Sequence, residues 1–302
     1  MSIARVPVDF FNPGQVFACL GLMEMTEVLF GAAEGAFVWG VAGSTQFALR
    51  GAGDGDPVAA CLEFLSKAEL YSIAPPDEDL STAKWDVRSR TSDDGSYPIP
   101  VPASPATLPA VLTDGERRIV IASWGETSSR EVLGTGRDNV KFWAGAGGYP
   151  GVGLLRDAIE LVRPQLQGAA TDPFALTAPQ TSSLRLDWRR DYIPIDIGFS
   201  LNEHTKIRPR GYPLVEILAV IGLCHARPQR VRKLEYRYSV VGSGDERDDI
   251  ASILLPPPLM RAGMGCAALP FPTRTFTMHL DWPGQENQAR CITTVHEEST
   301  TP

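Results

Sequence analysis

Long hydrophobic runs, cysteine and histidine are all scarce in this sequence. No stretch of 18 apolar residues occurs in the 302-residue chain, so we expect no membrane span. The first residues lack a basic segment followed by an apolar one, so no signal peptide is expected either. The five cysteines show neither metal-ligand spacing nor a dense disulfide framework. This usage favours a reduced, cytoplasmic setting.

Short catalytic motifs are also missing. The four histidines are His204, His225, His279 and His296. Cys224 and His225 are neighbours, but adjacent residues of a helix point in different directions. Neither HExxH nor GxSxG occurs, and no short motif groups carboxylates for metal binding. We therefore expect no metal, no cofactor and no enzymatic activity, although a site assembled from distant residues stays open.

The charge of the chain is distributed unevenly. Its net charge is −8, which argues weakly against nucleic acid. From Arg185 to Arg237, however, 11 Lys and Arg residues face 6 Asp and Glu residues, which gives +5. The remainder holds 17 basic and 30 acidic residues, which gives −13. One basic segment therefore lies inside an acidic protein.

Four segments have the apolar spacing and the terminal signals of helices. The first, "NPGQVFACLGLMEMTEVLFG", has Asn12 at the N-cap, Pro13 at the first helical position and Gly31 at the C-cap. It is apolar on several sides, which predicts a core helix from about Pro13 to Phe30. The other three segments are "DPVAACLEFLSKAEL", "GVGLLRDAIELVRPQL" and "YPLVEILAVIGLCHA".

Most of the remaining chain has the pattern of strands and loops. "AFVWGVA" and "TQFALRG" predict a hairpin. Strands are also indicated by "IARVPVDFF", "RRIVIASW", "SLRLDWRRDY", "KLEYRYSVVG" and "RTFTMHLDW". The expected class is α+β, with mixed, mostly antiparallel sheets, about four helices and no C-terminal helical bundle.

Two proline-rich stretches are read as breaks in the chain. The first is "YPIPVPASPATLP", from Tyr97 to Pro109, and the second is "LLPPPLMRAGMGC" near residue 256. The first break places a boundary between an N-terminal region, 1–110, and a central and C-terminal region, 111–302. A single compact unit is the alternative.

A glycine-rich stretch, residues 134–153, leads into the third expected helix. Backbone N–H groups and a helix N-terminus there are suited to an anion. Arg137 and Lys141 add positive charge and Trp143 adds a stacking surface, so we predict nucleic-acid contact. The spacing matches neither a Walker A loop nor a dinucleotide fingerprint. A flexible turn whose aromatic side chains pack inside is the alternative.

The basic segment is the second candidate for nucleic-acid contact. Its predicted phosphate-binding residues are Arg189, Arg190, Lys206, Arg208 and Arg210. Asn202 has the chemistry to bond adenine, and Lys206 to bond guanine. Two alternatives stay open: the arginines pair internally with nearby carboxylates, or the polar side chains are simply solvated.

Three stretches carry a resemblance to a known family. They are "VDFFNPGQVFACLGLMEMTEVLFGAAEGAF", "RLDWRRDYIPIDIGFSLNEH" with "GYPLVEILAVIGLCHARP", and the five residues from Lys141 to Gly145. Together they resemble the Cas-eight-type large subunit of the type I-U (I-G) CRISPR effector complex, Cascade. The resemblance covers about a third of the chain.

The resemblance implies a role within an RNA-guided complex. Such a subunit binds double-stranded target DNA at the protospacer-adjacent motif, helps form the R-loop and recruits the helicase-nuclease Cas3. Its other partners are the crRNA-containing backbone and Cas5-type subunits of Cascade. Guide pairing reads the long sequence, as in other guided effectors, and the protein reads the short motif. Two alternatives remain: a structural subunit that does not read DNA, and an enzyme with an unrecognised nucleotide site.

Overall fold

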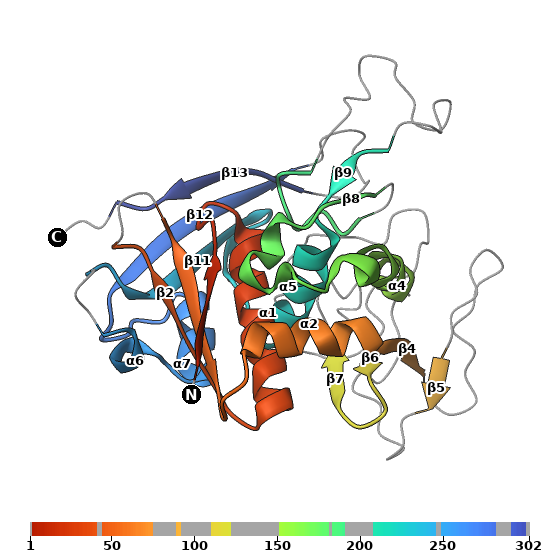
Figure 1. Cartoon of the computed structure of the whole chain (residues 1–302). Coiled ribbons are helices and arrows are strands. Elements are labelled where there is room, and N and C mark those ends of the chain that lie inside the picture. Colours follow the sequence, from red (N-terminus) through yellow and green to blue (C-terminus); the bar gives the residue numbers. More distant parts are fainter. Residues whose placement is uncertain are drawn as a thin grey trace.

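A seven-stranded sheet forms one side of the molecule (Figure 1). The computed structural model describes residues 2–40, 44–74, 89–91, 110–121, 151–180, 183–190, 208–245, 249–281 and 291–299. The strand order is β1-β3-β2-β11-β12-β13, and β10 pairs with β11. These strands are β1 Ile3–Pro7, β2 Ala33–Val38, β3 Gln46–Gly51, β10 Gln229–Arg232, β11 Glu235–Ser243, β12 Thr273–Asp281 and β13 Cys291–Glu297.

Four longer helices occur where the sequence predicts them. They are α1 Pro13–Phe30, α2 Pro57–Lys67, α4 Gly151–Val162 and α5 Pro213–His225. Two shorter ones, α6 Ile250–Ile253 and α7 Pro257–Met264, follow β11. The second proline-rich stretch is therefore not only a break, because Pro257 starts a helix at the position where its missing N–H has no partner to lose.

The strand pairing confirms the α+β class with mostly antiparallel sheets. In the large sheet only the β2–β11 pair is parallel. The predicted hairpin is β2–β3, with Phe37 opposite Phe47. Beyond residue 249 the described residues form α6, α7, β12 and β13, and these do not build a helical bundle.

Two further sheets are smaller. A four-stranded sheet has the order β5-β4-β6-β7, with β4 Glu69–Ala74, β5 Ser89–Thr91, β6 Ala110–Thr113 and β7 Arg118–Ile121. A two-stranded ladder joins β8 Ala178–Pro179 to β9 Arg210–Gly211. Short 3-10 turns, η3 Arg163–Gln165, η4 Ala169–Thr171 and η5 Pro173–Ala175, connect α4 to β8.

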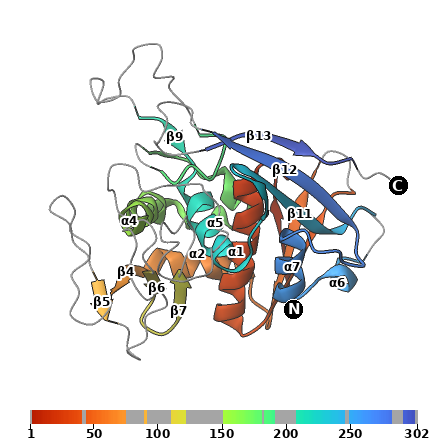
Figure 2. The same cartoon turned by 180° about the vertical axis from the view of Figure 1, so that it is seen from behind.

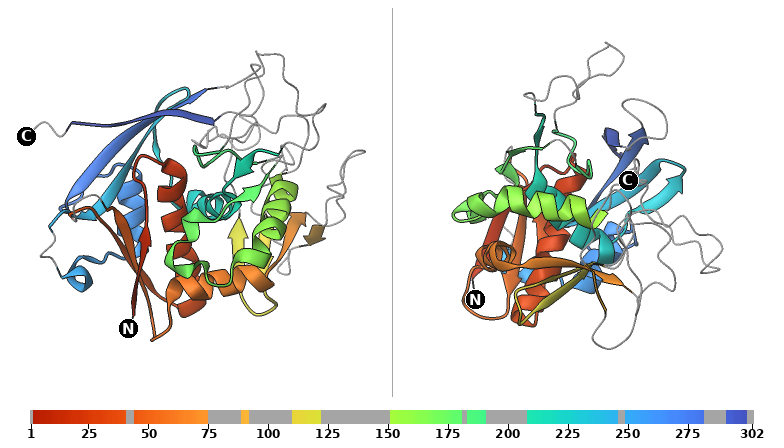
Figure 3. Two further views of the ribbon diagram at one scale, coloured as in Figure 1. Left: turned by 45° about the horizontal axis from the view of Figure 1, so that its top comes forward. Right: turned by 90° about the vertical axis from the view of Figure 1, so that its right-hand side faces the viewer.

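The core lies between the large sheet and α1 and continues beyond α1 to α2, α4, α5 and the β6–β7 hairpin. Tyr238 stacks on Phe276 with ring centroids 5.3 Å apart, and its hydroxyl donates to the carbonyl of Phe10 at 2.7 Å. Phe17 of α1 meets Tyr238 edge-on at 6.0 Å. Figure 3 shows α1 beside the sheet, with α5 and α4 farther away. The opening helix is thus a core element, as its apolar pattern predicts.

Helices α1 and α5 pack closely and run in the same direction. Gly21 faces Gly222, and Glu24 lies beside His225 one helical turn farther along both helices, so the two helices run in parallel. A Cβ atom at Gly21 would overlap the Leu218 carbonyl, and one at Gly222 would overlap that of Phe17. The close approach therefore needs glycine at both positions. Because the helices are parallel, both of their first turns lie at the same end of the molecule.

The C-terminal half of α1 contacts α7, which Figure 2 shows beside it. The guanidinium of Arg261 donates to the buried carboxylate of Glu24, with a 2.6 Å Nε–Oε1 distance, and to Glu27 at 3.2 Å. Glu24 and Glu27, the polar edge of the apolar helix, therefore face a cation.

The large sheet contains strands from both sides of residue 110. β1, β2 and β3 come before this residue, and β2 pairs with β11, which comes after it. The division into regions 1–110 and 111–302 stays a prediction. Among the described residues, no helix is long and apolar enough to cross a membrane.

Candidate nucleic-acid interface

Four of the nine predicted contact residues lie in the described part of the chain, and they are close together. Arg210 lies in the β8–β9 ladder and Arg208 two residues before it, and the second segment ends in Arg189 and Arg190. The backbone N–H of Gln180 donates to the Pro209 carbonyl at 2.8 Å, and Arg190 Nη2 donates to the Gln180 carbonyl at 3.4 Å. The structure thus brings together four arginines from two separate segments.

The other five predicted residues, Arg137, Lys141, Trp143, Asn202 and Lys206, lie outside the described residues. The glycine-rich stretch is described only from Gly151, where α4 begins. The predictions for these residues therefore stay predictions. The same holds for the proline-rich stretch from Tyr97 to Pro109.

Residues 183–190 were expected to form a strand, and the structure shows that this expectation is wrong. The segment is irregular, and Arg185 has a φ of 58°, which a strand does not allow. Its backbone N–H groups bond to a side chain instead of a neighbouring strand. Those of Leu184 and Arg185 donate to the carboxylate of Glu216, at 3.2 and 2.9 Å. The buried carboxylate of Glu216 on α5 thus takes the place of hydrogen bonds to a neighbouring strand.

Glu216 lies in the first turn of α5 and is fully buried. Its carboxylate also accepts a 3.2 Å hydrogen bond from Gln180 Nε2. Burial raises the pKa of Glu216 above its ordinary value of 4.5, while the nearby Arg190 and the three hydrogen bonds act in the opposite direction. The position at a helix N-terminus is a favourable one for negative charge. Glu216 therefore anchors Gln180, Leu184 and Arg185 to the first turn of α5.

Arg189 is engaged by its own neighbours. Its guanidinium forms a two-pronged contact with the carboxylate of Asp187, which includes a 2.6 Å Nη2–Oδ2 bond, and donates to the Phe174 carbonyl at 2.8 Å. It also lies 3.7 Å above the ring of Tyr212. Asp187 is only 1% exposed. The contacts match the internal-pairing alternative for Arg189, and its side chain remains partly exposed.

Asp187 also connects the segment to the opening helix. Asn12 Nδ2 donates to Asp187 Oδ1 at 3.0 Å, and both residues are buried. Asn12 occupies the N-cap position of α1, but its side chain makes no capping hydrogen bond. The expected cap is thus wrong in its chemistry, because the amide of Asn12 is held by a distant carboxylate. A Cβ at Gly14 would overlap the Leu186 carbonyl, so the two segments are in direct contact.

Arg190 is buried, whereas Arg208 and Arg210 are exposed. The exposed pair therefore provides the cations on this surface that solvent reaches most easily. A guanidinium at such a position can bond phosphate oxygens through two parallel N–H groups. The four arginines thus differ in exposure: Arg190 is buried, Arg189 is partly exposed, and Arg208 and Arg210 are exposed.

Two exposed aromatic residues border this cluster, and sequence reasoning missed both. Phe11 is 38% exposed and Trp188 is 39% exposed. Each is next in sequence to one partner of the Asn12–Asp187 hydrogen bond. The available signal was the sequence "DWRRDY", in which a tryptophan stands beside arginines. Only the arginines were considered there.

No group of three or more His, Cys, Asp or Glu side chains in the described ranges is placed to hold a metal ion. A groove of about 620 Å³ lies beside the C-terminal end of α2. Arg163, which lines it, donates to the carbonyls of Ser66 and Ala68 at 2.6 and 3.0 Å. Arg163 therefore caps α2.

Comparisons with known proteins found no matching family model, no matching curated protein and no matching solved structure. Membership of the Cascade large-subunit family therefore stays a prediction based on the resemblance.

Proposed function

We propose that this chain is a non-catalytic subunit of a crRNA-guided type I CRISPR surveillance complex, of the Cas-eight type found in subtype I-U (I-G). In this role it binds target DNA at the protospacer-adjacent motif and helps R-loop formation and Cas3 recruitment. The complex acts in the cytoplasm, beside its backbone and Cas5-type subunits. Guide pairing then supplies the long sequence recognition.

The described parts of the stretches that carry the resemblance are in contact with one another. The stretch from Val8 to Phe37 contacts the stretch that begins at Arg185 through the Asn12–Asp187 hydrogen bond and the Gly14–Leu186 contact. The stretch from Gly211 to Pro228 supplies α5, which packs along α1. The described residues of these stretches, 8–37, 185–190 and 211–228, thus pack against one another.

The observation that carries the nucleic-acid role is the pair of exposed arginines at the β8–β9 ladder, Arg208 and Arg210. They flank Pro209, whose carbonyl accepts from the N–H of Gln180, and the Gln180 carbonyl in turn accepts from Arg190. Arginine–phosphate contacts supply much of the affinity for DNA and position a protein on it. Arg189 and Arg190 act as positioning residues that hold the surface in place.

A structural assembly subunit is the second candidate, and the internal contacts of Arg189 and Arg190 favour it. Both guanidinium groups bond inside the protein, as supports of a fold rather than of a ligand. On this view the exposed arginines meet guide-bound neighbours and not DNA. The two candidates make different predictions for duplex binding.

The test compares two double variants by fluorescence anisotropy on a labelled duplex, across salt. Arg208→Ala with Arg210→Ala should weaken binding and lower the slope of log K against log salt by about 2, since each lost phosphate contact contributes about 1. Duplex affinity and salt slope unchanged from the unaltered chain would remove this surface from DNA binding and favour the assembly role.

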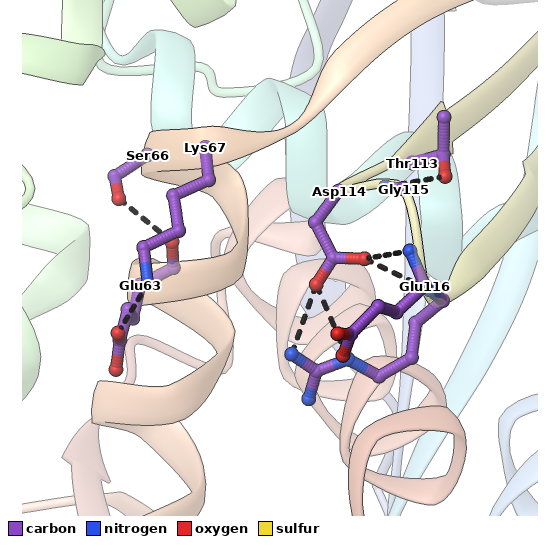
Figure 4. Close-up of polar contacts among 8 residues, drawn as sticks. Glu63, Ser66, Lys67, Thr113, Asp114, Gly115 and Glu116 are labelled. Atoms are coloured by element: carbon purple, nitrogen blue, oxygen red, sulfur yellow. Dashed lines mark hydrogen bonds and ion pairs between the residues drawn. The ribbon is translucent and has the colours of Figure 1, made fainter.

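The matched control is Arg117→Ala with Arg118→Ala, which removes the same charge from the β6–β7 hairpin. Both arginines are exposed. Figure 1 shows that hairpin at the opposite end of the helical layer from β8 and β9. Figure 4 shows Asp114 in its turn, where the carboxylate accepts from the backbone N–H groups of Glu116 and Arg117 at 3.0 and 2.8 Å. These backbone bonds persist in the control, so its turn should stay folded.

Membership of a guided complex has its own test. The tagged chain is isolated from its native cells under mild conditions, and the RNA that accompanies it is sequenced. We expect RNA with repeat-derived ends and a variable guide. Recovery of the chain without such RNA would contradict the CRISPR assignment, whatever the duplex assay shows.

A further inference from the structure

Phe11 and Trp188 are exposed although aromatic side chains are costly to leave in water. The large apolar side chains exposed within the described ranges are Phe11, Val28, Val120, Trp188 and Val231. The three valines are small and lie on separate elements. The two aromatics instead border one hydrogen bond, Asn12 to Asp187. Single exposed valines need no explanation, but two aromatic rings at one place do.

The backbone on either side of both rings is firmly held. Asp187, before Trp188, is buried and bonded to Asn12, and Arg189, after it, is bonded to Asp187 and Phe174. The N–H of Phe11 donates to Asp9 at 2.9 Å, and its ring meets that of Phe276 edge-on at 5.2 Å. The rings are therefore presented from ordered backbone. Little conformational entropy remains to be lost when something packs on them.

The charges around Trp188 indicate what that partner is. Arg189 follows it directly, and the ladder at Arg208 and Arg210 is joined to the same segment. Flat apolar faces beside guanidinium groups are the combination that binds bases and backbone phosphates of single strands. In a duplex the base faces are stacked on one another, so a ring on the protein cannot reach them. An unpaired base leaves its face available.

From this arrangement we infer that Trp188, with Phe11 on the other side of the Asn12–Asp187 hydrogen bond, is a stacking surface for unpaired nucleotides. The inference rests on the proposed nucleic-acid role and adds the kind of strand that this surface takes. Arg208 and Arg210 hold phosphates of either kind of strand, whereas Trp188 distinguishes a single strand from a duplex.

The test uses the full chain and two probes, a labelled oligothymidine of about 20 nucleotides and a duplex of the same length. Trp188→Ala should weaken oligothymidine binding about 5- to 150-fold, the range that loss of one stacked base gives. Its duplex affinity should stay within about twofold. Trp188→Phe keeps an aromatic face and should retain most of the single-strand affinity. Oligothymidine should also quench tryptophan fluorescence in the unaltered chain more than in Trp188→Phe.

Val120→Ala is the control, because it shortens an exposed apolar side chain on β7. It should leave both affinities unchanged, and thermal unfolding should show that Trp188→Ala is folded. Equal weakening on the two probes, or an oligothymidine affinity within twofold of the unaltered chain, would overturn the inference. In either case the duplex result for Arg208 and Arg210 stands by itself. A third outcome would also overturn the inference: Trp188→Ala binds oligothymidine normally, but the complex isolated with it lacks partner proteins. Trp188 would then belong to a protein-docking surface.

Discussion

Asn12 and Asp187 are 175 residues apart in sequence and are joined by a buried hydrogen bond of 3.0 Å. Asn12 precedes the first helix, and Asp187 lies in the irregular segment that carries Trp188 and Arg189. The carboxylate of Asp187 accepts from Asn12 and from both the backbone and the guanidinium of Arg189. One buried charge therefore sets the position of the opening turn and of the candidate interface together.

Replacement of Asp187 by Ala should destabilise the protein by about 3 kcal/mol, because it leaves a buried amide and a partly buried guanidinium without their acceptor. Asn12→Ala should cost about 1–2 kcal/mol. Urea unfolding of both single variants and the double variant gives the coupling between them, which should be between about 0.5 and 3 kcal/mol. Strictly additive effects would show that the hydrogen bond contributes nothing to stability.

Replacement of Gly21 by Ala should destabilise the protein although alanine is the better helix former. The gain in helix propensity is about 1 kcal/mol. The added methyl overlaps the Leu218 carbonyl, a backbone atom that moves only if α5 moves, and overpacking of this kind costs about 1–3 kcal/mol or more. Thermal unfolding should therefore show a lower midpoint. A higher midpoint would mean that α1 and α5 are not in close contact.

Glu216→Gln should change the pH dependence of stability. Because the pKa of Glu216 is raised in the folded protein, the fold binds this proton more tightly than the unfolded chain does. The stability that the protonated form provides is present below pH 4.5 and is lost as the pH rises through the raised pKa. The stability of the unaltered chain relative to Glu216→Gln should thus fall over that interval. Parallel pH profiles from urea unfolding at each pH would contradict this assignment.

Leu20→Ala tests the core role of the opening helix. Leu20 is 1% exposed, so its truncation should cost about 2–5 kcal/mol, depending on how far the neighbours collapse into the cavity. Val28→Ala, at an exposed position of the same helix, is the matched control and should cost under about 0.5 kcal/mol. Similar losses for the two variants would contradict the burial.

Local signals in the sequence were sufficient for the helices and for most strands. Pro13, Gly31 and Asp56 mark helix ends by chemistry that involves only a few neighbouring residues. The Asp56 carboxylate accepts from the N–H groups of Val58 and Ala59, as a local cap requires. The α+β class followed from these elements and their spacing.

Contacts between distant segments were the part that the sequence did not reveal. Alternation in "SLRLDWRRDY" indicated a strand, but the segment bonds to Glu216 and Asn12, which no local pattern connects with it. Asn12 had the right residue type for a cap and met a carboxylate 175 residues away. The charge count identified the basic segment. The three-dimensional structure was needed to show that Arg190 is buried and Arg208 is exposed.

The parallel packing of α1 on α5 has a consequence for biosynthesis. The first residues of the two helices, Pro13 and Pro213, are 200 positions apart, so α1 emerges from the ribosome long before its main partner. At 5–20 residues per second, the wait is roughly 10–40 s. Throughout it, a helix whose residues from Pro13 to Thr26 are all buried in the finished fold exposes that surface to solvent. The nascent chain is a client for chaperones over this period, and a fragment that ends at residue 110 should aggregate.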